Sequence, residues 1–192
     1  MPGSIKIDDG SGNYTILTNG GSLGSDKTLT IPNQTATLAT TKAVEVDQYQ
    51  INSDITADAF PITTLVRPTG KLQNYPGTGM SQSSGNWTFP STGYYEIFIY
   101  GRIKPNSAGH SAYLGVQATD DNFGTSADQI LALRVEVESG DRVNVAGKVI
   151  VKITDTANDK VQISFDEVTD AVLEGGSAEM VSGVIFTKLG DL

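Results

Sequence analysis

Residues 85–103 read GNWTFPSTGYYEIFIYGRI and decide the fold class, because a tight turn there leads into a long β-strand. Pro90 and Gly93 bracket the turn, and the residues after it are the aromatic and β-branched types that strands favour. Successive side chains of a strand point to opposite faces. One face therefore carries Tyr95, Ile97 and Ile99, and the other carries Tyr94, Glu96, Phe98, Tyr100 and Arg102.

The second face of this strand is more apolar than a face covered by water should be. Phe98 and Tyr100 lie on it together with Glu96, so we expect something other than water to cover it. Two kinds of cover are open at this point: loops of the same subunit, or neighbouring copies of the chain. We favour the second, which indicates an assembly protein.

The rest of the chain predicts strands and hardly any helix. Segments 130–138 and 160–166 alternate apolar and polar residues, and segment 180–189 is apolar on both faces around Val184. Eight or nine short strands with turns between them predict an all-β fold, an antiparallel β-sandwich of the jelly-roll type. The predicted core residues are Tyr95, Ile97, Ile99, Val135, Val137, Val151, Ile163 and Phe165.

Composition excludes several classes of protein. The 192 residues carry a net charge of −9 with no cysteine, which argues against a nucleic-acid partner, a disulfide framework and thiolate metal sites. No apolar run approaches the roughly 20 residues of a membrane span, so we expect no membrane insertion. The first residues have no basic region followed by an apolar one, so we also expect no signal peptide.

The first 45 residues differ from the rest, because they are rich in Thr, Gly, Ser and Asn and nearly neutral. Short β-favouring pieces are visible at Ser4–Ile7, Tyr14–Leu17, Lys27–Ile31 and Gln34–Leu38. Such a segment buries too little surface to be stable alone, so it is either a flexible tail or, as we favour, ordered by neighbouring chains. We therefore divide the chain into a β-rich anchor or shaft (1–45), a junction (46–58) and a jelly-roll head (59–192).

The sequence offers little chemistry for catalysis. The one histidine, His110, lies in a predicted turn without a serine, cysteine or second histidine paired to it, so we expect no enzyme and no cofactor. Asp120, Asp121 and Asp128 are weak candidates for a calcium site, against the alternative of a turn held by the aspartate side chains themselves. Beyond these, no metal site is expected.

Two motifs resemble the tumour-necrosis-factor-like jelly rolls, which include the globular heads of complement and collagen-type trimers. Segment 89–99, FPSTGYYEIFI, is similar to the turn and central strand of that family, and segment 181–186, VSGVIF, is similar to its closing strand. The resemblance implies a homotrimer in which Glu96, Phe98 and Tyr100 lie towards the three-fold axis. The collagen repeats and cysteines of the animal members are missing, so their receptors are not implied.

Segment 22–40 resembles bacteriophage fibre and other virion proteins, in which a Thr-Leu-Thr-Ile-Pro strand precedes Thr-Leu-Ala-Thr. This resemblance implies a phage structural protein made in the host cytoplasm and located on the virion. A capsid decoration, cement or head-fibre protein is favoured, with residues 1–45 contacting other virion proteins. One alternative is a tail-fibre or receptor-binding tip that recognises a host-surface glycan or protein. A further alternative is a carbohydrate-binding module that uses aromatic residues between Tyr75 and Trp87.

Overall fold

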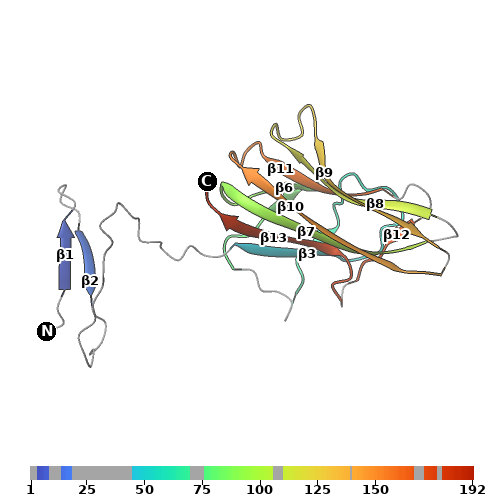
Figure 1. The fold of residues 1–192 in the computed structure, drawn as a ribbon, viewed down its shortest axis with the longest axis horizontal. Coiled ribbons are helices and arrows are strands. Elements are labelled where there is room, and N and C mark those ends of the chain that lie inside the picture. The colour runs from blue at the N-terminus through green and yellow to red at the C-terminus, as the bar shows by residue number, and fades with distance from the viewer. Residues whose placement is uncertain are drawn as a thin grey trace, which may run out of the picture. The chain divides into compact units, whose positions relative to one another are not determined.

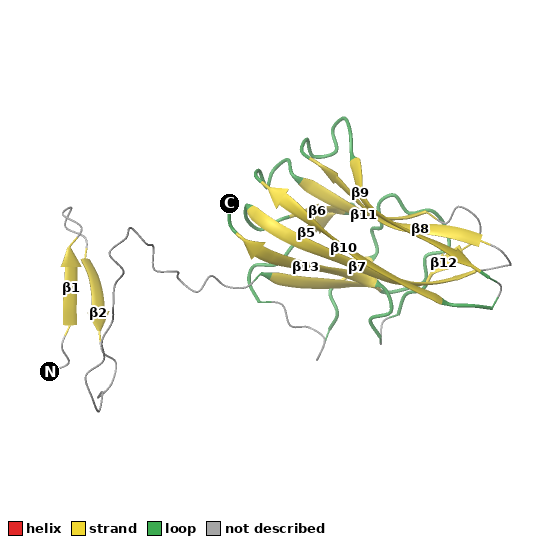
Figure 2. Cartoon of the chain, viewed as in Figure 1, coloured by secondary structure: helices red, strands yellow, loops and turns green. Residues whose placement is uncertain are grey.

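The computed structural model describes residues 4–8, 14–18, 45–69, 76–105, 110–138, 140–166, 171–176 and 179–192. They belong to two compact units, Met1–Thr41 and Lys42–Leu192. Figure 2 shows strands joined by loops, and these ranges contain no helix. Accordingly, none of the described elements is a helix able to cross a membrane.

The described part of the first unit is a hairpin. Strand β1 (Ser4–Asp8) pairs antiparallel with β2 (Tyr14–Thr18), and Ile5 lies opposite Leu17. A two-stranded hairpin is at best marginally stable in water by itself. The other two predicted strands, 27–31 and 34–38, lie outside the described residues.

The second unit contains two antiparallel sheets. The first runs in the order β10–β7–β13–β3–β4, and a short strand β12 pairs with the end of β7. Figure 1 shows β7, β13 and β3 side by side, so the first strand of this unit lies next to the last. The bounds are β3 (Val46–Ile51), β4 (Leu65–Val66), β7 (Gly93–Pro105), β10 (Val143–Ile153), β12 (Ala171–Leu173) and β13 (Gly183–Gly190).

The second sheet runs in the order β5–β6–β11–β8–β9. Its strands are β5 (Ser81–Ser83), β6 (Asn86–Thr88), β8 (His110–Thr119), β9 (Asp128–Val137) and β11 (Lys160–Asp166). From β7 onward the chain passes from one sheet to the other and back several times, because β10 and β13 belong to the first sheet and β8, β9 and β11 to the second. This exchange between two facing sheets is the jelly-roll arrangement.

Aromatic rings join the two sheets in the core. Trp87 of β6 lies 4.4 Å from the ring centre of Tyr49 in β3 and 5.1 Å from that of Phe186 in β13. Among the predicted core residues the following are buried: Tyr95, Ile97, Ile99, Val135, Ile163 and Phe165. Val151 is partly buried against them, and the side chain of Val137 is outside the described set.

The first half of the predicted junction 46–58 is regular structure: Val46–Ile51 is strand β3, hydrogen-bonded to β13 and, at its end, to β4. The segment VDQYQI hides this role because its buried residues include Asp47 and Gln50. Segment 59–66, at the start of the predicted head, contains little regular strand. Only Leu65–Val66 is regular strand, and Ala59 makes one isolated bridge to Phe165. Pro61, which has no N–H to donate, interrupts the segment.

Candidate assembly face

The outward side of the first sheet is the candidate site, and strand register fixes its layout. Glu96, Phe98 and Tyr100 of β7 each lie in a cross-strand row with β10, β13 and β3. The row through Phe98 contains Lys148, Phe98, Ile185 and Gln48. The row through Tyr100 contains Ala146, Tyr100, Gly183, Gln50 and Val66. Glu96, Phe98 and Tyr100, which the sequence analysis assigned to one face, therefore lie along the middle of the sheet.

This face is largely apolar at its centre. The rings of Phe98 and Tyr100 stack with their centres 5.9 Å apart. Towards the edges, Ile150 is 58% exposed, Tyr94 42% and Val66 40%, so large apolar side chains meet solvent on both flanks of the stacked pair. Exposed apolar residues clustered on one sheet face mark an interaction surface.

Two buried polar atoms on this face have no hydrogen-bond partner among the described residues: the Tyr100 hydroxyl and Gln50 Oε1. They lie in one row, on either side of Gly183. A Cβ at Gly183 would lie 2.8 Å from the Tyr100 hydroxyl oxygen and 2.2 Å from the Tyr49 carbonyl oxygen, so only glycine leaves room for the tyrosine ring. Burial raises the pKa of Tyr100 to about 12. A buried polar atom without a hydrogen bond lowers the free energy of unfolding, so a group that hydrogen-bonds to these two atoms would stabilise the protein.

Charged groups border the apolar centre. Lys148 Nζ donates to Glu96 across 2.7 Å, which pairs the one carboxylate that the sequence analysis placed beside Phe98. At the far end of β7, Glu174 is nearly buried and accepts from Arg102, from Arg142 at 3.2 Å and from Lys104 at 3.3 Å. Burial raises the pKa of Glu174, but these cations outweigh it and the net pKa lies below its usual value.

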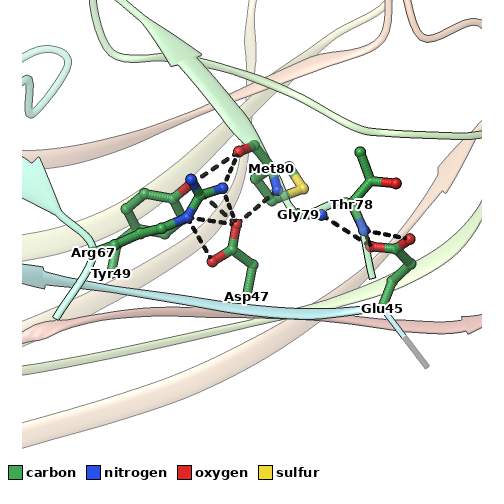
Figure 3. A network of polar contacts seen from close by, with 7 residues as sticks. All are labelled: Glu45, Asp47, Tyr49, Arg67, Thr78, Gly79 and Met80. Atoms are coloured by element: carbon green, nitrogen blue, oxygen red, sulfur yellow. Dashed lines mark hydrogen bonds and ion pairs between the residues drawn. The ribbon is translucent and has the colours of Figure 1, made fainter. Parts of the chain in front are cut away.

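A second polar network fixes β3, and sequence reasoning missed it (Figure 3). Asp47 is 2% exposed and accepts from Arg67 Nη2 at 2.8 Å and from the Met80 N–H at 2.7 Å. Figure 3 shows Arg67 and Tyr49 on one side of this carboxylate and Met80 on the other. The Tyr49 hydroxyl lies 3.0 Å from Asp47 and 2.9 Å from the Met80 carbonyl, and it donates its proton to one of them. The sequence contains one signal for this network: Asp47, Tyr49 and Ile51 alternate along the strand, so the Asp47 carboxylate is on the face that packs against the core.

The predicted calcium candidates do not form a metal-binding group in the described residues. Asp121 instead closes a turn: its carboxylate accepts from the Thr119 hydroxyl at 2.5 Å and from the N–H groups of Gly124 at 3.1 Å and Thr125 at 2.9 Å. These bonds lower its pKa to about 2. The side chains of Asp120 and Asp128 line a neighbouring hollow. The first position of β8 is His110, whose side chain is outside the described set.

The aromatic platform considered for a carbohydrate-binding module is not available at Trp87, because this side chain is fully buried between the sheets. Tyr75 lies outside the described residues. A sugar ring stacks on an exposed aromatic face. The prediction that Trp87 contributes to a carbohydrate-binding platform is therefore wrong.

Two facing antiparallel sheets with this strand order define the class of fold, a jelly roll, and solved structures of the same fold exist. The structure of Eiger TNF from S. frugiperda is 12% identical, with a TM-score of 0.51, and the match covers 79% of this chain and 96% of that one. Murine APRIL is 11% identical, with a TM-score of 0.54, and the match covers 76% and 99%. The predicted all-β, tumour-necrosis-factor-like jelly roll is thus confirmed as a fold. No family model and no curated protein matches the sequence.

Proposed function

We propose that this protein is a non-enzymatic structural protein of a bacteriophage virion, in which three copies form a spike on the particle. The observation that carries the trimer is the outward face of the first sheet, where an apolar centre encloses two buried polar atoms without a hydrogen-bond partner in the described part of the chain, the Tyr100 hydroxyl and Gln50 Oε1. In the proposed trimer both side chains turn towards groups of the neighbouring copy that pair with them, and that copy removes Ile150 and Val66 from water. The likeness to tumour-necrosis-factor-like folds supports the same face, since the family resemblance implies that this face lies towards a three-fold axis.

The virion assignment rests on the N-terminal segment. It forms a compact unit separate from the jelly roll, and its described part is a hairpin too small to be stable alone. Its Thr-rich pattern at 22–40 resembles phage fibre proteins. In this proposal residues 1–45 bind other virion proteins and the acidic jelly roll projects from the particle. Capsid decoration is proposed first, and a tail fibre or receptor-binding tip is the alternative that the copy number per particle separates from it.

Two measurements test this proposal separately. Sedimentation equilibrium of the purified chain at micromolar concentration should give three times the mass of 20.3 kDa, and a stable monomer contradicts the assembly face. Quantitative mass spectrometry of purified particles then gives the copy number. Hundreds of copies indicate capsid decoration and tens or fewer indicate a tail fibre or receptor-binding tip. Absence of the chain from virions refutes the virion role without affecting the trimer.

A further inference from the structure

The outward side of the second sheet contains a hollow with a volume of about 240 Å³. Its floor is one cross-strand row of small residues: Ser164 of β11, Gly115 of β8 and Ala132 of β9. The next row along the same strands has larger side chains, including Asp166 and Tyr113. A row of small residues beside a row of large ones produces a depression in the surface of the sheet.

The far wall of this hollow is built by Gln129. Its Nε2 donates to the carbonyl oxygens of Val116 at 3.1 Å and Leu131 at 2.5 Å, at the register shift between β8 and β9. These bonds draw the amide across Gly115, where a Cβ would come within 2.4 Å of Nε2. The glycine is therefore needed for Gln129 to adopt this position, so the wall and the floor depend on each other.

The side wall is Phe60, which is 53% exposed although its neighbours are held rigidly. Ala59 and Phe165 exchange two backbone hydrogen bonds of 2.8 and 3.0 Å, and Ile62 donates to Ile163 at 2.8 Å. This segment therefore lies along the edge of β11 and presents the Phe60 ring beside the floor. In the row beside the floor, the Arg134 guanidinium of β9 lies 5.6 Å from the ring centre of Tyr113 on β8, the second aromatic of the lining.

We propose that this hollow binds one neutral sugar ring. Two aromatic side chains offer apolar contact area for the C–H face of a pyranose. Asp166, Ser164 and Gln129 place a carboxylate, a hydroxyl and an amide oxygen around the same space, and these groups pair with sugar hydroxyls. The volume is below that of sites for drug-sized ligands, which fits a single ring. Asp166 is the one charged group among the described residues of the lining, so an anionic sugar is disfavoured. The proposal does not depend on the virion role, and the site is on the opposite sheet from the assembly face.

The test is a titration of the full chain, followed by amide-resolved NMR, with methyl glycosides of glucose, galactose and N-acetylglucosamine. At least one should shift the amides of Gly115, Gln129 and Ser164 with a millimolar dissociation constant. Phe60→Ala should weaken that binding about three- to tenfold by removing the ring contact. Ala132→Leu should abolish it by filling the floor from an exposed position.

Leu189→Ala is the matched control, because Leu189 is also 53% exposed but lies on β13 of the other sheet. It should leave binding unchanged. Glucosamine and glucuronic acid are titrated in parallel. The proposal is overturned if none of the three neutral glycosides shifts these amides, if only the cationic glucosamine does, or if Phe60→Ala and Ala132→Leu both bind like the unchanged protein.

Discussion

Replacing Tyr100 by phenylalanine removes one buried hydroxyl and leaves the stacked ring in place, which makes it the sharpest probe of the assembly face. In a lone subunit the hydroxyl has no partner in the described residues, so its removal should raise the free energy of unfolding by about 1–3 kcal/mol. In a trimer that covers this face, the hydroxyl is paired with a group of the neighbouring copy. The same substitution then removes a hydrogen bond and weakens assembly.

The sign of the effect thus separates the two states. If each of the three hydroxyls contributes about 1 kcal/mol, the substitution weakens the free energy of trimer assembly by about 3 kcal/mol, which raises the dissociation constant about 100-fold.

Burial raises the pKa of Tyr100 from 10.0 to about 12, so the folded state keeps the hydroxyl proton at a pH where the unfolded chain has lost it. Stability should therefore fall as the pH rises above about 10, and less steeply in Tyr100→Phe.

The assay is urea unfolding at several protein concentrations, combined with sedimentation equilibrium. Tyr95→Phe is the matched control, because its hydroxyl donates to the Ser91 carbonyl at 2.9 Å within the same subunit. The control should lose about 1 kcal/mol at every concentration and keep its mass. If Tyr100→Phe stabilises the protein at all concentrations and leaves the dissociation constant unchanged, no neighbouring copy pairs the hydroxyl and the assigned face is wrong.

Three further substitutions give distinct readouts. Phe98→Asp should convert the trimer to monomers in sedimentation, because it places an unpaired charge in the centre of the buried face; an intact trimer contradicts the assignment. Glu174→Gln should cost about 1–3 kcal/mol at neutral pH by weakening the pairs with Arg102 and its neighbours. Because the folded pKa of Glu174 is lowered, the wild type should lose this advantage as the pH falls below about 4.5, and equal acid unfolding curves would falsify its role. Gly183→Ala should cost about 1–3 kcal/mol in urea unfolding, since its Cβ would meet the Tyr49 carbonyl at 2.2 Å, and an unchanged midpoint means that the strand can shift.

Strands with strict alternation were predictable because their pattern follows from burial alone. Segment 160–166 has the predicted bounds, and Tyr95, Ile97 and Ile99 all lie on the buried side. Strand β3 was not predictable in this way. Its inward-facing residues include Asp47, a charge that is buried only because Arg67 and the Met80 N–H come to it from distant parts of the chain. No local pattern contains those partners.

The candidate sites divide in the same manner. The face with Phe98 and Tyr100 followed from alternation, since a single strand defines it. The hollow beside Phe60 did not, because its floor depends on the register of three strands and on the shift that brings Gln129 over Gly115. At Trp87 the sequence indicated a site that the structure does not have. This aromatic residue lies in a turn-rich region and was expected to contact a ligand, but its side chain is fully buried in the core.

Strand β3 also determines how the jelly roll responds to force. It is the first strand of the second unit, so tension carried along the chain from residues 1–41 enters the fold through residue 45. Over Val46–Tyr49 this strand pairs with β13 alone, because β4 covers only Gln50 and Ile51, and it is held by its register with β13 and by the Asp47–Arg67 ion pair. A pull directed along β3 loads these bonds in shear, so they must break together and not one after another, as they would when a strand is peeled from an edge. The tether therefore enters the jelly roll at a mechanically resistant point.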